Sequence, residues 1–123
     1  MHYQLPPHAE TKLVRCTAGA IYDVIIDIRP GSPVFRQWFA TELTSTNRHI
    51  LYVPEGFAHG FQTLADNTEV YYQHSAFFSP GHQRGLRFDD PAFKIAWPLA
   101  VSAISDRDGN HALIDEHFAG MRL

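Results

Sequence analysis

The chain has 123 residues, of which 45% are hydrophobic, so it is long enough to bury one core of the common domain size. With histidines neutral the net charge is -3, which gives no electrostatic reason to expect a nucleic acid or an anionic membrane as a partner. No apolar run approaches the roughly 20 residues of a membrane span, no leader pattern is visible, and a single cysteine, Cys16, excludes an internal disulfide. We therefore expect residues 1–123 to form a single domain in the cytoplasm.

Short β-prone segments follow one another along the chain, separated by turns that contain proline and glycine. The clearest is AIYDVIIDI, whose branched side chains favour a strand and which Pro30 and Gly31 bring to an end. Strands are predicted at residues 12–16, 20–28, 37–43, 49–53, 59–64 and 69–74. The Ala-Asp-Asn sequence at 65–67 predicts a hairpin turn between the last two. This spacing is typical of an antiparallel sandwich or barrel.

The remaining segments show less periodicity. Residues 78–98 are rich in proline and glycine and predict a loop, whereas ALIDEHFAGM, residues 112–121, predicts a short C-terminal helix. The residues expected in the core are Ile21, Val24, Ile26, Leu51, Val53, Phe61 and Val70. Ile25 and Ile28 are expected to face a second sheet or a partner.

Eight histidines are scattered through the sequence at positions 2, 8, 49, 59, 74, 82, 111 and 117. No HxH or HExxH spacing occurs among them, so the sequence alone gives no reason to expect a metal site.

Six phrases of this sequence occur together, in the same order, in one known family. They are HYQLPPHAETKLVR (2–15), AIYDVIIDIRPGSP (20–33), PEGFAHGFQTL (54–64), EVYYQHSAFFSP (69–80), RGLRFDDPAFKIAWP (84–98) and SDRD (105–108). Together they resemble the dTDP-4-dehydrorhamnose 3,5-epimerases, which are cofactor-free cupin enzymes acting on sugar nucleotides. The resemblance implies an all-β, cupin-type antiparallel jelly-roll. It also implies that this chain lacks the family's N-terminal segment.

Epimerisation beside a ketone needs a base on one face of the sugar, an acid on the other, and a group that stabilises the enolate between them. The resemblance implies that His2 is the base and that Asp108 is the carboxylate that orients it. It assigns Lys12 to the enolate oxygen and Tyr72 to the acid. Tyr71 and Tyr72 point to opposite faces of a strand, so only one of them can face a cavity.

The same resemblance implies four substrate-binding residues, which are His59, Arg107, Phe78 and Gln4. Phe78 departs from the tyrosine of many members, which keeps an aromatic face for the nucleotide base but loses a hydroxyl. Arg107 suits a phosphate because guanidinium can bind phosphate oxygens in pairs. The implied substrate is a dTDP-4-keto-6-deoxyhexose, epimerised at carbons 3 and 5 in rhamnose-type biosynthesis without a cofactor or metal. Bare sheet edges lead us to expect a homodimer.

Two other functions remain open at this point. Without the N-terminal segment, the chain could be a non-catalytic sugar-nucleotide-binding module. A metal-dependent cupin isomerase or dioxygenase would need closely spaced histidines and a glutamate, of which GFAHGF supplies one histidine.

Overall fold

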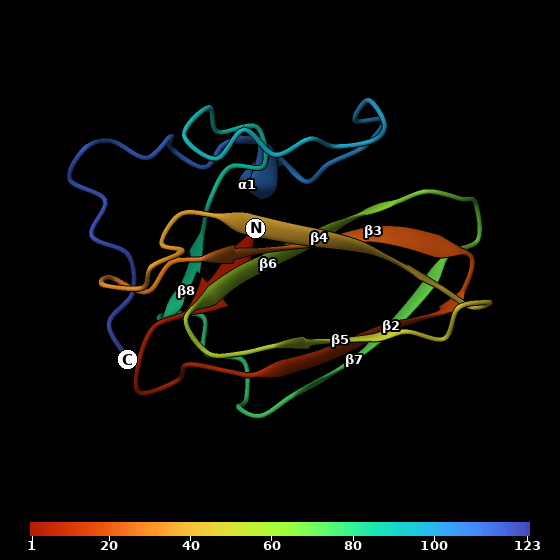
Figure 1. Cartoon of the computed structure of the whole chain (residues 1–123), viewed down its shortest axis with the longest axis horizontal. Helices are drawn as coiled ribbons and strands as arrows, with labels where there is room; N and C mark the ends of the chain where they lie inside the picture. Colours follow the sequence, from red (N-terminus) through yellow and green to blue (C-terminus); the bar gives the residue numbers. More distant parts are fainter.

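The computed structural model describes residues 1–123 and consists of two antiparallel β-sheets and one short helix (Figure 1). The larger sheet has five strands in the order β4-β3-β6-β1-β8, and the smaller has three in the order β5-β2-β7. The elements are β1 (His2–Gln4), β2 (Lys12–Ala18), β3 (Ala20–Asp27), β4 (Trp38–Thr44), β5 (Ile50–Val53), β6 (Phe57–Thr63), β7 (Glu69–His74), β8 (Gln83–Gly85) and α1 (Asp106–Gly109).

The two sheets lie face to face, and the chain after β8 runs across the outer side of the larger one (Figure 1). All six predicted strands are present, with ends that differ by no more than two residues from the prediction. The all-β antiparallel prediction is therefore confirmed. No helix in this structure has the length and apolar character needed to cross a lipid bilayer.

Strand β3 is buried on both of its faces, which explains its almost continuous run of branched residues. Ile21 and Ile25 point toward the smaller sheet and pack with its Val14 and Val53. Alternate residues of β3 point the other way, because side chains alternate across a strand. Each fully buried isoleucine of this kind contributes about 1.5–3 kcal/mol to folding.

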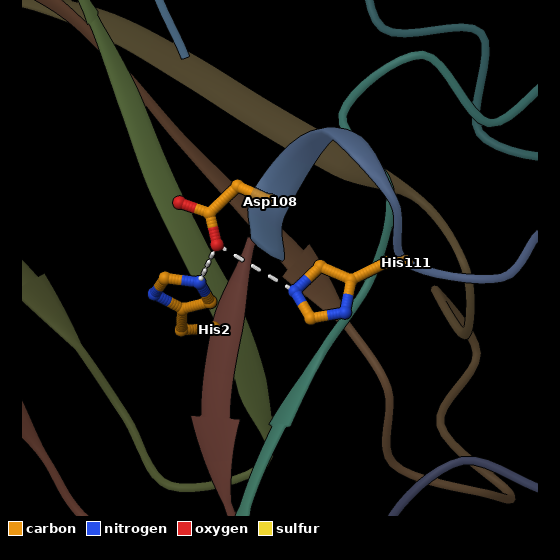
Figure 2. Close-up of side chains that lie close together, drawn as sticks. All are labelled: His2, Asp108 and His111. Carbon is orange, nitrogen blue, oxygen red and sulfur yellow. Dashed lines mark hydrogen bonds and ion pairs between the residues drawn. The ribbon is translucent and has the colours of Figure 1, made fainter. Parts of the chain in front are cut away.

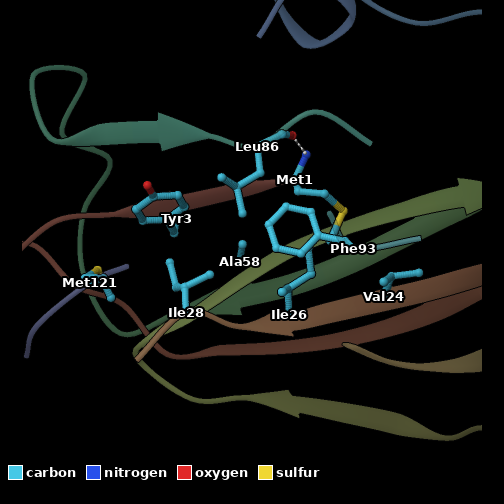
Figure 3. Close-up of a cluster of buried hydrophobic side chains, with 9 residues drawn as sticks. All are labelled: Met1, Tyr3, Val24, Ile26, Ile28, Ala58, Leu86, Phe93 and Met121. Atoms are coloured by element: carbon cyan, nitrogen blue, oxygen red, sulfur yellow. Dashed lines mark hydrogen bonds between the residues drawn. The ribbon is translucent and has the colours of Figure 1, made fainter. Parts of the chain in front are cut away.

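The outer face of the larger sheet is covered by the C-terminal part of the chain (Figure 3). Val24, Ile26 and Ile28 contact side chains of β1 and of the covering segment, including Leu86, Phe93 and Met121. The backbone of Met121 also donates a hydrogen bond to the carbonyl of Ile28 at 2.6 Å. The sandwich therefore has two apolar layers, one between the sheets and one outside the larger sheet.

Most of the residues predicted for the core are buried, but not all of them. Ile21, Val24, Ile26 and Val53 are buried, as are Ile25 and Ile28, whereas Leu51 and Val70 are partly buried. Phe61 was expected in the core, but this was wrong, since it is 39% exposed. It shares the inner face of β6 with His59 and lines a cavity instead of packing against the opposite sheet.

Two predictions about local structure are wrong. Residues 112–121 do not form a helix, because their backbone bonds to the body of the protein: Ile114 donates to the Asp90 carboxylate at 2.7 Å, and Gly120 has a φ of +73°. The helix is instead α1, which Ser105 caps. Residues 65–67 do form a turn, but it joins β6 of one sheet to β7 of the other and is not a hairpin.

Candidate active site

A cavity of about 730 Å³ lies between the inner faces of the two sheets at one end of the sandwich. The larger sheet contributes His2 and His59 to its wall, and the smaller sheet contributes Lys12, Tyr72 and His74. Six of the eight site residues predicted from the sequence line this cavity, namely His2, Lys12, His59, Tyr72, Phe78 and Asp108.

His2 and Asp108 form a hydrogen-bonded pair although 106 residues separate them in the chain. Nε2 of the imidazole lies 2.7 Å from Oδ1 of the carboxylate (Figure 2). Strand β1 fixes His2 between β6 and β8, where it is paired with His59 and Gly85. With Nε2 bound to the carboxylate, Nδ1 is the ring nitrogen that can accept a proton from another molecule.

The surroundings of this pair keep the carboxylate charged and the imidazole neutral near pH 7. Burial lowers the pKa of His2 below its usual 6.5, and the hydrogen bond to Asp108 offsets part of that decrease. For Asp108, burial would raise the pKa, but hydrogen bonds from His2 and Ser105 and the charge of Arg107 lower it to about 2. A neutral imidazole held by an ionised carboxylate is the arrangement that a general base requires.

A second histidine–carboxylate pair stands beside the first. His59 lies directly across from His2 on the neighbouring strand, so the two imidazoles share one face of the sheet. Nε2 of His59 is 2.6 Å from Oδ1 of Asp23, whose side chain is fully buried. The carboxylate thus fixes the ring orientation of His59 at the cavity wall.

Lys12 is buried at the opposite wall, where it is 6% exposed. Its Nζ lies 3.2 Å from Oε1 of Glu10, and the other oxygen of Glu10 lies 2.6 Å from Nδ1 of His74. This carboxylate holds Lys12 and His74 at the cavity wall, and a buried ammonium such as that of Lys12 needs a partner of opposite charge. The ammonium of Lys12 has three donors, so it retains capacity to bind a negatively charged oxygen.

Tyr72 and Tyr71 are almost equally exposed, at 49% and 48%, but on opposite faces of β7. Tyr72 lines the cavity, with its ring centroid 5.0 Å from that of His74. Tyr71 lies on the outer face of the smaller sheet beneath Arg15. The structure therefore places the predicted acid, and not its neighbour, in the cavity.

Gln4 and Arg107 do not line the cavity. The amide of Gln4 is buried and bonded to protein backbone, accepting from the Ser79 nitrogen at 2.6 Å and donating to the carbonyls of His8 and Phe77. Nη1 of Arg107 donates to Oε1 of Gln83 at 3.0 Å, and its Nε donates to Oδ1 of Asp108 at 3.3 Å. Gln4 thus shapes the loop that carries Phe78, and Arg107 supports the charge of the carboxylate.

Three residues near the site were not predicted from the sequence, namely Glu10, His74 and His111. His74 could have been found, because it lies two residues after Tyr72 and so shares its face of the strand. Glu10 precedes its strand, and His111 follows α1 without any periodic pattern. Their positions depend on the tertiary fold.

Comparisons with known proteins agree with this geometry. Residues 1–116 match the dTDP-4-dehydrorhamnose 3,5-epimerase family. The enzyme of that name from Sinorhizobium fredii is 45% identical over 117 residues, which cover 94% of this chain and 60% of the relative. The chain thus spans about three fifths of the length of that curated relative.

Two solved structures share the fold. The dTDP-4-dehydrorhamnose 3,5-epimerase of Bacillus anthracis, with TDP and PPi bound, has a TM-score of 0.89 and 42% identity, covering 92% of this chain and 65% of its own. A 3,5-epimerase of Legionella pneumophila in complex with dTDP-4-keto-L-rhamnose has a TM-score of 0.89 and 33% identity, covering 99% and 66%. These matches confirm the cupin-type jelly-roll expected from the sequence. This chain belongs to the dTDP-4-dehydrorhamnose 3,5-epimerase family.

Proposed function

We propose that this protein epimerises a dTDP-4-keto-6-deoxyhexose at carbons 3 and 5 by proton transfer through an enolate. The observation that supports this most directly is that candidate base and acid stand on opposite walls of one cavity. His2 belongs to the larger sheet and Tyr72 to the smaller, and both line the cavity. A sugar ring between them would expose one face to each.

In the proposed reaction, Nδ1 of His2 removes the proton from the carbon next to the ketone. Asp108 stabilises the imidazolium that forms, because its carboxylate is already hydrogen-bonded to Nε2. The negative charge moves to the ketone oxygen, where the ammonium of Lys12 stabilises it. The hydroxyl of Tyr72 then donates a proton to the opposite face of the carbon, which inverts its configuration.

The relatives support the substrate class. The Legionella structure contains dTDP-4-keto-L-rhamnose, and the Bacillus structure contains TDP. We infer that Phe78, at the cavity wall and 64% exposed, stacks on the thymine base. His59, held by Asp23, would hydrogen-bond the sugar.

The test is deuterium exchange from heavy water into a dTDP-4-keto-6-deoxyhexose, followed by NMR. We expect exchange at carbons 3 and 5 with the parent protein, and His2→Ala should slow it by roughly 10²–10⁴-fold, the usual contribution of a general base. His117→Ala is the control, because that histidine is exposed and does not line the cavity. If the parent binds the sugar nucleotide but exchanges no proton, the protein is a binding module.

We further propose a homodimer formed through the outer face of the smaller sheet. This face exposes an apolar patch made of Leu13, Ile50, Tyr52 and Tyr71. Patches of this kind are typical of association surfaces. Sedimentation at micromolar concentration should give a dimer, and Tyr52→Glu should convert it to a monomer. A parent protein that sediments as a monomer would refute this assembly.

The proposed location is the cytoplasm. It is supported by Cys16, which is a free, buried thiol, as is usual for cysteines in reducing compartments. Cell fractionation would test it.

A further inference from the structure

His111 places a third metal-ligating side chain at the His2–Asp108 pair (Figure 2). Its Nε2 lies 3.6 Å from Oδ1 of Asp108, the same carboxylate oxygen that His2 contacts. This nitrogen is shielded from solvent and has no hydrogen-bond partner. The donor atoms of the three side chains all lie within 4.8 Å of one another.

The position of His111 depends on a glycine in the adjacent strand. Gly85 of β8 is paired with His2, and a Cβ at Gly85 would collide with the His111 ring. The missing side chain leaves the space beside His2 that the imidazole of His111 fills. The two imidazole rings lie edge to face, with centroids 6.0 Å apart.

Two imidazoles and a carboxylate are a donor set that suits Zn²⁺, which binds such groups at about 2.0–2.2 Å. In a tetrahedral site the donor atoms would be about 3.3 Å apart. The Asp108–His111 distance of 3.6 Å is close to this value, and the His2–Asp108 distance of 2.7 Å would have to open slightly. Both His2 and Asp108 are partly exposed at the cavity wall, so this adjustment requires no core rearrangement.

We propose that His2, Asp108 and His111 form a Zn²⁺-binding site and that the bound ion inhibits the reaction by occupying the base. The inhibition, though not the binding, rests on the proposed function. Zinc at Nε2 of His2 displaces the proton from that nitrogen to Nδ1, so no proton is lost overall. Nδ1 then carries hydrogen and can no longer accept a proton from the sugar. The ion also takes the Asp108 oxygen that would stabilise the imidazolium.

Binding is tested by titrating ZnCl₂ into chelator-treated protein in a calorimeter. The parent should bind zinc at this site, and His111→Phe should weaken that binding at least tenfold. Phenylalanine keeps a ring against Gly85 and removes no hydrogen bond from Nε2, since none exists there. His117→Ala should leave the affinity unchanged, and melting curves confirm that each variant is folded. Absence of zinc binding by the parent, or equal affinity in His111→Phe, would overturn the site.

Long-range ¹H–¹⁵N NMR of the histidine rings supplies a readout that does not depend on activity. Zinc should convert His2 to the tautomer with hydrogen on Nδ1, and a chelator should reverse the change. Retention of the Nε2–H tautomer in the zinc-loaded protein would contradict the coordination.

Deuterium exchange with and without zinc tests the inhibition. Zinc should suppress exchange by the parent and EDTA should restore it, whereas the exchange rate of His111→Phe should be the same in zinc as in EDTA. Acceleration by zinc would overturn the inhibitory role and favour a metal-dependent isomerase. If the parent exchanges under neither condition, the proposed function fails, whereas the binding titration still decides the site.

Discussion

Asp108 and Asp23 have the same side chain and the same kind of partner, but they differ in exposure. Asp23 is fully buried beside His59, whereas the side chain of Asp108 is 27% exposed at the cavity wall. Asp108 also has Arg107 within 3.3 Å, and its pKa of about 2 keeps it ionised through the physiological range. It can therefore respond to a charge that appears on His2 during a reaction.

Replacing Asp108 by asparagine should change the pH dependence of exchange. Burial lowers the pKa of His2, and the hydrogen bond and charge of Asp108 counteract this. Without that charge the pKa of His2 falls further, so the acidic limb of the rate profile, where the base becomes protonated, moves to lower pH. The plateau rate should also fall, by about 10–100-fold, which is the usual effect of replacing a hydrogen-bond partner of a metal-ligating histidine.

The measurement is the exchange rate between pH 4 and 8 in the presence of EDTA, at roughly half-unit intervals around the histidine pKa. Asp106→Asn is the matched control, because Asp106 lies in the same short helix without contacting His2. An acidic limb that moves to higher pH in Asp108→Asn would contradict the pairing.

Individual site residues could be predicted from the sequence where they lie within one of the family phrases. The family phrases contain His2, Lys12, Tyr72 and Asp108, and all four reach the cavity. His111 lies beyond the SDRD phrase, and its place depends on the absence of a side chain at Gly85. No local pattern contains that information.

Strand β7 shows how an element determines which of two identical side chains faces the cavity. The sequence predicted its limits correctly, since EVYYQH is bounded by clear turns. Strands β1 and β8 were not predicted because each has three residues, too few to show alternation. They become strands by pairing with each other and, for β1, with β6.

Removing the two tyrosine hydroxyls of β7 one at a time tests whether Tyr72, which faces the cavity, and not Tyr71 donates the proton. Tyr72→Phe should impair net inversion while leaving exchange of the abstracted proton, because the enolate can be reprotonated from the original face. Tyr71→Phe should leave both rates unchanged, since its ring lies outside the cavity. Product formation is measured beside exchange by NMR. Equal effects of the two substitutions would contradict the proposal that Tyr72 is the acid because it faces the cavity.

On the scale of the whole molecule, the segment after β8 belongs to both the core and the site. It supplies Phe93 and Met121 to the apolar layer outside the larger sheet and Asp108 to the cavity wall. Residues 86–98 of this segment are irregular, as predicted, but the terminal helix predicted at 112–121 was wrong because the backbone of Ile114 and Met121 bonds to Asp90 and Ile28 instead. We propose that residues 1–123 fold as one domain because this segment links both regions.

Met121→Ala tests whether the C-terminal segment and the two sheets unfold together as one domain. Met121 is 2% exposed, and truncating a buried methionine costs about 2–5 kcal/mol of the free energy of unfolding. Chemical denaturation should give that decrease, and calorimetry should show one cooperative transition in both proteins. Met121 is not among the residues that line the cavity, so the substitution should not act through the site. Two separate transitions in the parent would contradict the single domain.

The pairing of β1 with late strands has a consequence for synthesis on the ribosome. β1 leaves the ribosome before β6 and β8 exist, so it must wait for both neighbours. During that time the outer face of β3 has no covering segment, and exposed apolar surface of this kind is prone to aggregation. His2 obtains its carboxylate only when Asp108 has been made, 106 residues later. Until then the proposed base has no carboxylate partner. We expect the yield of folded protein in cells to depend on whether chaperones cover the exposed apolar face of β3 during synthesis.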